Sequence, residues 1–226
     1  MSAFIAAEGM PELEKLLWIL VCMVGARSAA MAFNRIMDAR FDMRNPRTQG
    51  RAIPSGQVDV KSYWLFLIVS SAIFIFAAGM LNLLALYLSP VALVIVFFYS
   101  LTKRFTAYSH FWLVGFDILY SCMDVNFDRD SGLKSIPQKF GVENALRISF
   151  ASHGLMILFL LILLQSVSDL GILYFAGVVI VGGLLIYEHS LVRPDDLSKI
   201  NVAFFNMNGI ISIGLMVFVV ADCVWV

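Results

Sequence analysis

The sequence predicts an all-α membrane protein with six full membrane spans and one short helix. Hydrophobic residues make up 60% of the 226 residues and charged residues only 14%, and the mean hydropathy is +0.85. A soluble domain of average composition holds about 25% charged residues. Backbone polar groups must bond within the chain when they lie in lipid, so the long apolar runs are expected to be helices.

Six apolar runs approach the roughly 20 residues that cross a bilayer. They are Leu16–Phe33, Tyr63–Met80, Leu83–Leu101, Ala145–Gln165, Leu170–Tyr187 and Phe204–Val224. A seventh run, Phe111–Met123, is too short to span alone unless it continues through the following aspartates or re-enters the membrane. Met1–Ala7 has no basic segment or long apolar core, so it does not resemble a signal peptide.

Basic residues predict the orientation of these spans, because cytoplasmic loops collect Lys and Arg. All but Lys15 and Arg27 of the 16 Lys and Arg residues lie in segments 35–61, 103–104, 129–147 and 193–199. The connections at 81–82 and 166–169 hold none, so we place them outside. The formal net charge is zero, which gives no reason to expect binding to nucleic acid.

The charge pattern also predicts that a crossing is missing after Arg104. Lys103 and Arg104 belong in the cytoplasm, and so does the loop after Asp124, so an even number of crossings must separate them. About 20 residues lie between, whereas a helical round trip takes about 40. Either Phe111–Met123 enters the membrane and returns, or the chain lacks about one helix and part of another.

Polar residues recur every fourth position in two segments, Asn34-x-x-x-Asp38-x-x-x-Asp42 and Tyr120-x-x-x-Asp124-x-x-x-Asp128. This spacing places each trio on one face of a helix, and Arg27 and Asp117 extend the two faces. Neighbouring carboxylates repel each other and are costly near lipid unless a cation joins them. The two pairs therefore predict a site for Mg²⁺, which prefers oxygen ligands and takes some of them from phosphate.

A weak internal repeat supports pairing the two clusters. Arg51-Ala-Ile-Pro54 follows the first and Lys134-Ser-Ile-Pro137 follows the second, and pseudo-symmetric halves that share a site are common in membrane proteins. Six basic residues could contact a diphosphate: Arg47, Arg51, Lys103, Arg104, Lys134 and Lys139. For any single one of them, the general preference of basic residues for cytoplasmic loops is an equally good explanation. The three cysteines and three histidines are scattered without metal-ligand spacing, which favours packing roles.

These motifs resemble those of UbiA-type prenyltransferases. The first motif continues into Arg47-Thr48 and Arg51-Ala-Ile-Pro54-Ser55-Gly56, the second into Gly132-Leu-Lys134-Ser135, and Tyr99-x-x-x-Lys103-Arg104 is similar to the family's pattern after its fourth helix. Phe116-Asp117-Ile-Leu-Tyr120 and the stretch from Tyr187-Glu-His189 to Asn208 suggest the 4-hydroxybenzoate polyprenyltransferase branch, which includes enzymes that prenylate a dihydroxynaphthoate in menaquinone synthesis.

The resemblance implies a UbiA-like transmembrane helix bundle, in which family members form a ring of nine helices. Residues 1–226 would form a single prenyltransferase domain that is incomplete relative to the family. Its first helix is reduced to a stub that ends near Ala7, and the fifth helix with the start of the sixth is absent between Ser109 and Val114.

The resemblance further implies transfer of a polyprenyl group from an allylic diphosphate to an aromatic acid, of the 4-hydroxybenzoate or dihydroxynaphthoate type. Mg²⁺ would be bound by Asp38, Asp42, Asp124 and Asp128, and Asp117 would orient or deprotonate the phenol of the acceptor. Substrate contacts would come from Asn34, Arg47, Arg51, Lys103, Arg104, Tyr120 and Lys134.

The expected location is the bacterial cytoplasmic membrane, with both aspartate motifs facing the cytoplasm. Two other functions stay open. A truncated remnant could retain the motifs without the activity. A secondary transporter would also carry intramembrane carboxylates, but near the bilayer midplane, whereas these lie at helix ends beside basic loops.

Overall fold

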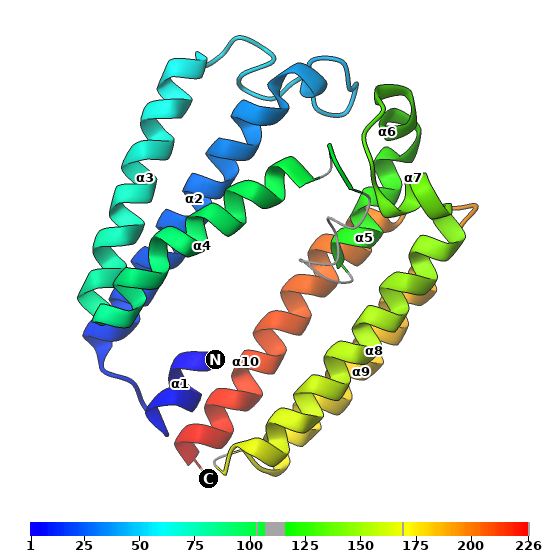
Figure 1. Cartoon of the computed structure of the whole chain (residues 1–226). Helices are drawn as coiled ribbons and strands as arrows, with labels where there is room; N and C mark the ends of the chain where they lie inside the picture. The colour runs from blue at the N-terminus through cyan, green and yellow to red at the C-terminus, as the bar shows by residue number, and fades with distance from the viewer. Residues whose placement is uncertain (103, 107–115, 169, 226) are drawn as a thin grey trace. The chain divides into compact units, whose positions relative to one another are not determined.

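The computed structural model describes residues 1–102, 104–106, 116–168 and 170–225 (Figure 1). Its regular structure in these ranges is helical, apart from one isolated bridge between Arg193 and Asp196. The chain forms two compact units. Unit 1 comprises Met1–Pro11 and Thr106–Val226, and unit 2 comprises Glu12–Phe105.

Unit 2 consists of three long helices, α2 (Leu13–Asp42), α3 (Val60–Leu81) and α4 (Leu83–Thr102). α2 packs along α3, and small buried residues line its inner face. A Cβ atom on Gly25 would lie 3.1 Å from Cβ of Phe74. The missing side chain at Gly25 therefore lets the two helices approach closely, as small residues do in membrane bundles.

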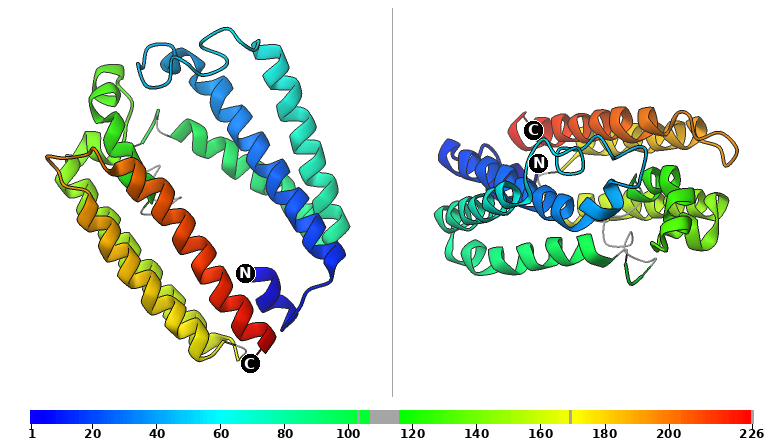
Figure 2. Two further views of the ribbon diagram at one scale, coloured as in Figure 1. Left: turned by 180° about the vertical axis from the view of Figure 1, so that it is seen from behind. Right: turned by 90° about the horizontal axis from the view of Figure 1, so that it is seen from above.

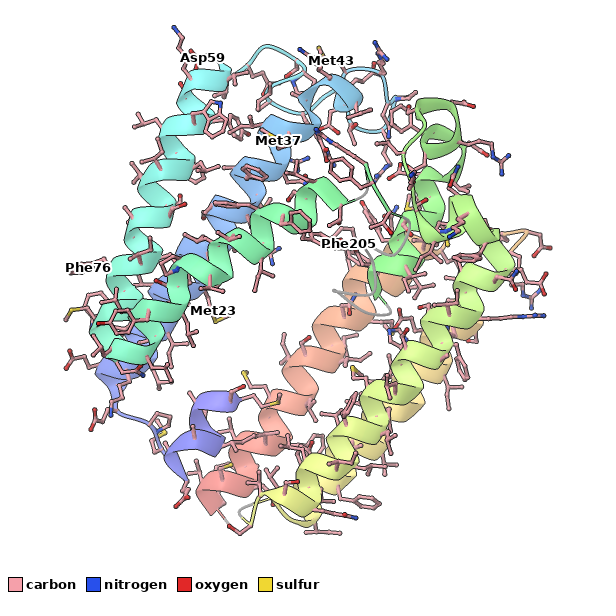
Figure 3. The ribbon with its side chains drawn as sticks, viewed as in Figure 1. Met23, Met37, Met43, Asp59, Phe76 and Phe205 are labelled. Atoms are coloured by element: carbon pink, nitrogen blue, oxygen red, sulfur yellow. The ribbon has the colours of Figure 1, made fainter. Side chains whose placement is uncertain are left out.

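Local polar contacts support the ends and the interior of these helices. Asp59 precedes α3 (Figure 3), and its carboxylate accepts a hydrogen bond of 2.8 Å from the backbone N–H of Ser62. The side-chain and backbone hydrogen bonds of Ser62 lower the pKa of Asp59. In α4, Pro90 has no N–H for the carbonyl of Leu86, and the hydroxyl of Ser89 donates to that carbonyl at 2.8 Å instead.

Unit 1 holds three long helices, α8 (Val142–Ser166), α9 (Ile172–Leu191) and α10 (Asn208–Trp225), which lie side by side (Figure 2). A π-helix, η3 (Val202–Met207), precedes α10. The remaining elements are short: α1 (Ser2–Ala7), α5 (Phe116–Ser121), the 3₁₀ turn η2 (Cys122–Asp124), α6 (Val125–Ser131) and α7 (Ile136–Phe140).

A buried aspartate joins two helices of unit 1. Asp222 on α10 is 1% exposed, and its carboxylate accepts hydrogen bonds from the backbone N–H groups of Gly171 and Tyr174. These groups belong to the start of α9, whose first N–H groups have no partner within the helix. The hydroxyl of Tyr174 donates to the carbonyl of Leu160 at 2.9 Å. One aspartate and one tyrosine thus connect α10, α9 and α8.

The six predicted spans are confirmed as long apolar helices. Among the described residues, six helices are long and apolar enough to cross a membrane: Leu13–Asp42, Val60–Leu81, Leu83–Thr102, Val142–Ser166, Ile172–Leu191 and Val202–Trp225. The first is longer than expected, because the helix continues through the first aspartate motif to Asp42. The predicted short helix is present from Phe116, whereas residues 111–115 and the break expected between Ser109 and Val114 lie outside the described residues.

We expect Gly177→Ala to destabilise unit 1. A Cβ atom there would lie 2.8 Å from Cβ of Phe218, and such overpacking costs about 1–3 kcal/mol. Gly183→Ala on the same helix is the matched control, because its Cβ atom would meet no described atom of unit 1 within 4 Å. Thermal unfolding in detergent should show a lower Tm for Gly177→Ala alone. Equal Tm values for the two variants would contradict the close contact between α9 and α10.

Candidate active site

The first aspartate motif lies on one continuous helix, as its spacing predicted. Asn34, Asp38 and Asp42 all belong to α2. Asp38 and Asp42 are 3% and 5% exposed, and Asn34 is half-buried. Arg27, seven residues before Asn34 on the same helix, is exposed. Two buried carboxylates one turn apart at the end of a membrane-spanning helix require compensation by cations.

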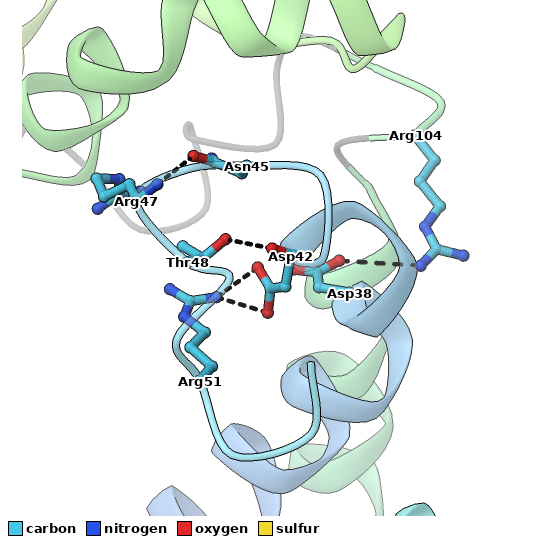
Figure 4. Close-up of polar contacts among 7 residues, drawn as sticks. All are labelled: Asp38, Asp42, Asn45, Arg47, Thr48, Arg51 and Arg104. Carbon is cyan, nitrogen blue, oxygen red and sulfur yellow. Dashed lines mark hydrogen bonds and ion pairs between the residues drawn. The ribbon is translucent and has the colours of Figure 1, made fainter. Parts of the chain in front are cut away.

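Arg51 supplies one of these cations (Figure 4). Its Nη1 atom lies 2.7 and 2.8 Å from the two carboxylate oxygens of Asp42. The hydroxyl of Thr48 donates to the carbonyl oxygen of Asp42 at 3.3 Å. Asn45 accepts a hydrogen bond of 2.9 Å from the backbone N–H of Arg47. The loop after α2 is therefore folded back so that Arg51 meets the last residue of the helix.

Arg104, which follows α4, supplies the second cation. Its Nη2 atom lies 3.8 Å from Oδ1 of Asp38 and donates to the backbone carbonyl of Met37 at 2.6 Å. The guanidinium carbon lies 5.6 Å from the centroid of the Phe41 ring, within the range of a cation–π interaction. Two predicted substrate contacts, Arg51 and Arg104, are thus brought to the aspartates of the first motif. Arg47 is exposed, and Lys103 lies outside the described residues.

The second motif differs from the expectation of one continuous α-helical face. Asp117 and Tyr120 lie on α5, Asp124 ends the 3₁₀ turn η2, and Asp128 lies in the first turn of α6. A 3₁₀ turn holds three residues instead of 3.6, so the four-residue spacing from Tyr120 to Asp124 does not stack the two side chains as in an α-helix. All four side chains are half-buried.

The predicted cations of the second motif lie just beyond it. α6 ends at Gly132, whose φ of +68° is a left-handed conformation that glycine adopts easily. α7 begins after Ser135, whose hydroxyl accepts a hydrogen bond from the N–H of Gln138. Lys134 and Lys139 are exposed on either side of this turn. The predicted helix-breaking Pro137 stands at the start of α7, where its missing N–H is tolerated.

Tyr120 belongs to a cluster of three aromatic rings in unit 1. Its ring stacks on Phe204 with centroids 4.4 Å apart and meets Phe205 edge-on at 5.8 Å. Both phenylalanines come from the π-helix η3 (Figure 3 labels Phe205), and π-turns are frequent at functional sites. The sequence alone does not single out Phe204 or Phe205, because aromatic residues make up 13% of the chain and no spacing distinguishes these two.

The carboxylates fit Mg²⁺ in their chemistry. In neither unit do the described residues gather three His, Cys, Asp or Glu side chains that could hold a metal ion by themselves. Mg²⁺ commonly takes only one or two carboxylates and completes its shell with water and substrate phosphate. The buried pair Asp38 and Asp42 and the half-buried pair Asp124 and Asp128 each match that requirement. His153 and His189 instead contact each other, with Nδ1 and Nε2 3.0 Å apart, in agreement with packing roles.

Comparisons with known proteins agree with the predicted fold and family. The profile of the UbiA prenyltransferase family matches residues 1–115 and 110–210. A 4-hydroxybenzoate octaprenyltransferase from Shewanella woodyi is 27% identical, over 92% of this chain and 84% of the relative. An enzyme of the same name from Vibrio vulnificus is 28% identical, over 96% of this chain and 88% of the relative.

Two solved structures share the fold. The apo structure of a UbiA homolog from Aeropyrum pernix matches with a TM-score of 0.86 and 25% identity, and the match covers 97% of this chain and 95% of that one. A digeranylgeranylglyceryl phosphate synthase matches with a TM-score of 0.62 and 18% identity, over 98% of this chain and 90% of that one. Six apolar helices among the described residues and the match to the family profile define an integral membrane transferase. The chain belongs to the UbiA prenyltransferase family.

The family match is divided at the place where the sequence predicts a missing segment, between Ser109 and Val114. The two family matches meet at residues 110–115. The alignment with the Vibrio vulnificus enzyme extends over 254 positions, more than the 226 residues of the whole chain. That relative therefore contains internal residues without a counterpart here.

A double-mutant cycle should reveal the strength of the Asp42–Arg51 pair. Asp42→Asn and Arg51→Gln remove the charges of a pair whose side chains are 8% and 29% exposed. We expect a coupling free energy of about 1–3 kcal/mol from urea unfolding in metal-free detergent. Glu143 and Arg147 form the control. Oε1 of Glu143 and Nη2 of Arg147 are also 2.7 Å apart, but the two side chains are 64% and 72% exposed. Their coupling should stay below about 0.5 kcal/mol, and equal values would show that burial adds nothing.

Proposed function

We propose that this chain transfers a polyprenyl group from an allylic diphosphate to an aromatic acid of the 4-hydroxybenzoate type, in the bacterial inner membrane. The observation that carries the proposal is the pair of buried carboxylates at the end of α2, each with an arginine beside it. The names of the bacterial relatives support the choice of both substrates. Dihydroxynaphthoate remains the alternative acceptor, which would place the enzyme in menaquinone synthesis.

Binding of the diphosphate is the first task of the site. Arg51 and Arg104 are the cations beside the first motif, and arginine suits phosphate because its planar fork can donate two parallel hydrogen bonds. We assign Arg47, Lys103 and Lys134 to the same substrate. Asp38, Asp42, Asp124 and Asp128 would hold Mg²⁺, which when bound neutralises the negative charge of the departing diphosphate. This assignment requires the two motifs to face one cavity.

Transfer then exchanges one bond for another. The allylic carbon–oxygen bond breaks and the diphosphate leaves, a bond forms between the allylic carbon and a carbon of the aromatic ring, and that ring carbon loses its proton. Positive charge develops on the prenyl group, and an aromatic face such as that of Tyr120 stabilises it. Phe204 and Phe205 hold the Tyr120 ring in place. We assign Asn34 to the polar lining and Asp117 to orienting or deprotonating the phenol.

Activity should depend on the aspartates of both motifs. Asp38→Ala and Asp124→Ala should each reduce prenyl transfer below detection, because each removes a carboxylate assigned to Mg²⁺. The assay follows product from octaprenyl diphosphate and 4-hydroxybenzoate in detergent with Mg²⁺, and Asp195→Ala, an exposed aspartate outside the motifs, should retain full activity. Full activity in EDTA would rule out the metal. If the wild-type chain is inactive although a cooperative thermal unfolding transition shows that it is folded, the non-catalytic remnant is favoured.

Both motifs should face the cytoplasm, as the distribution of basic residues requires. Single cysteines at Thr106 and Ser131, in a background without Cys22, Cys122 and Cys223, should react with a membrane-impermeant thiol reagent from the cytoplasmic side only. Inverted and right-side-out vesicles provide the comparison. Labelling of the two positions from opposite sides would mean that the second motif cannot share a site with the first.

A further inference from the structure

The carboxylate of Asp42 is occupied by one arginine on both of its oxygens. Nη1 of Arg51 donates to Oδ1 at 2.7 Å and to Oδ2 at 2.8 Å, which places this nitrogen between the two oxygens (Figure 4). The rest of the carboxylate is enclosed, since the side chain of Asp42 is only 8% exposed. A magnesium ion would bind such oxygens at about 2.0–2.1 Å. Arg51 therefore competes with any metal ion for both oxygens of Asp42.

Positive charge exceeds negative charge around the two aspartates of α2. Asp42 has Arg51 beside it, and Asp38 has Arg104 at 3.8 Å. A third arginine, Arg35, lies half-buried on the same helix, and its charge interacts with those of Arg51, Asp42 and Asp38. Among the described residues of unit 2, three arginines thus surround two carboxylates, which leaves one positive charge in excess. Such a cluster repels a free dication and attracts an anion.

Binding of Mg²⁺ alone at Asp42 therefore has an electrostatic cost. The ion would have to displace Arg51, whose side chain is only 29% exposed. The displaced guanidinium would then lie beside a dication without a carboxylate of its own. Taking one partner away from a buried ion pair is strongly unfavourable, because the remaining charge is left uncompensated. The pair of Asp42 and Arg51 thus opposes binding of the metal by itself.

A diphosphate removes this cost, because it offers both cations a new partner. Its oxygens accept the paired hydrogen bonds of a guanidinium and also coordinate Mg²⁺. The backbone N–H of Arg51 donates to the carbonyl of Thr48 at 3.0 Å, and the carbonyl of Arg51 accepts from the N–H of Ser55 at 2.9 Å. Since these bonds hold the backbone, rotation of the Arg51 side chain is enough to move its guanidinium from the carboxylate to a phosphate.

We propose that Arg51 makes metal binding at the first motif conditional on diphosphate. In the free protein its guanidinium occupies the carboxylate of Asp42. When a diphosphate arrives, the guanidinium moves to the phosphate oxygens and leaves that carboxylate to Mg²⁺. The inference rests on the proposed function, in which Asp38 and Asp42 hold the metal, and it adds the order of binding. By thermodynamic linkage, each ligand then raises the affinity for the other by the same factor.

Calorimetry with the purified full chain in detergent tests this order. Mg²⁺ is titrated into the wild type, Arg51→Gln and Arg44→Gln, without and with inorganic diphosphate, and the complex that the two ligands form in solution is subtracted. Arg44→Gln is the matched control, because it removes the same charge from an exposed residue two positions after Asp42. The double variant Asp42→Asn/Arg51→Gln shows whether a gain in affinity comes from Asp42. A thermal unfolding transition shows that each variant is folded.

Arg51→Gln should bind Mg²⁺ alone about tenfold or more tightly than the wild type does. Arg44→Gln should stay within about threefold of the wild type, because solvent and salt screen an exposed charge. The double variant should lose the gain. Diphosphate should raise the Mg²⁺ affinity of the wild type by about tenfold or more, and that of Arg51→Gln by a smaller factor.

Equal affinities of the wild type and Arg51→Gln for Mg²⁺ alone would overturn the inference and leave the proposed metal site intact. If Arg51→Gln does not fold, the wild type decides the question. An Mg²⁺ affinity of the wild type that diphosphate leaves unchanged contradicts the conditional binding. A wild-type protein that binds no Mg²⁺ under either condition would instead refute the metal role in the proposed function, and the inference with it.

Discussion

Lipid cannot hydrogen-bond to the backbone or solvate a charge, and the described contacts of this chain follow from that constraint. Where Pro90 leaves the carbonyl of Leu86 without its helical donor, the hydroxyl of Ser89 takes its place. Where α9 begins beside Gly171, which has no side chain to cap it, Asp222 from α10 accepts the free N–H groups. In both places a polar side chain supplies the partner that the helix backbone lacks.

At the first aspartate motif, two arginines compensate for the buried carboxylates. Asp42 stands at the last position of α2, where the helix dipole disfavours negative charge, and Arg51 compensates for both the carboxylate and the dipole. Arg104 compensates for the charge of the Asp38 carboxylate and also donates a hydrogen bond to the carbonyl of Met37. These arginines neutralise the carboxylates and hold them in position.

The π-helix η3 connects the chemistry of unit 1 to its apolar surface. It brings two consecutive phenylalanines to Tyr120, one stacked and one edge-on, and it continues directly into α10. This continuous helical segment thus contributes Phe204 and Phe205 to the aromatic cluster at its start. Its buried face, with Ile211 and Leu215, packs on the core.

The sequence by itself determined the membrane spans and the residues of the motifs. Long apolar runs have no alternative to helix in lipid, and Asp38 and Asp42, at a spacing of four within one helix, must share a face. The tertiary structure decided which cations meet which carboxylates, because Arg51 and Arg104 reach α2 through a folded loop and from another helix. It also decided the 3₁₀ turn before Asp124 and the pairing of Tyr120 with Phe204. Arg104 and Met37, and Tyr120 and Phe204, lie far apart in the chain, and periodicity and spacing do not encode contacts of that kind.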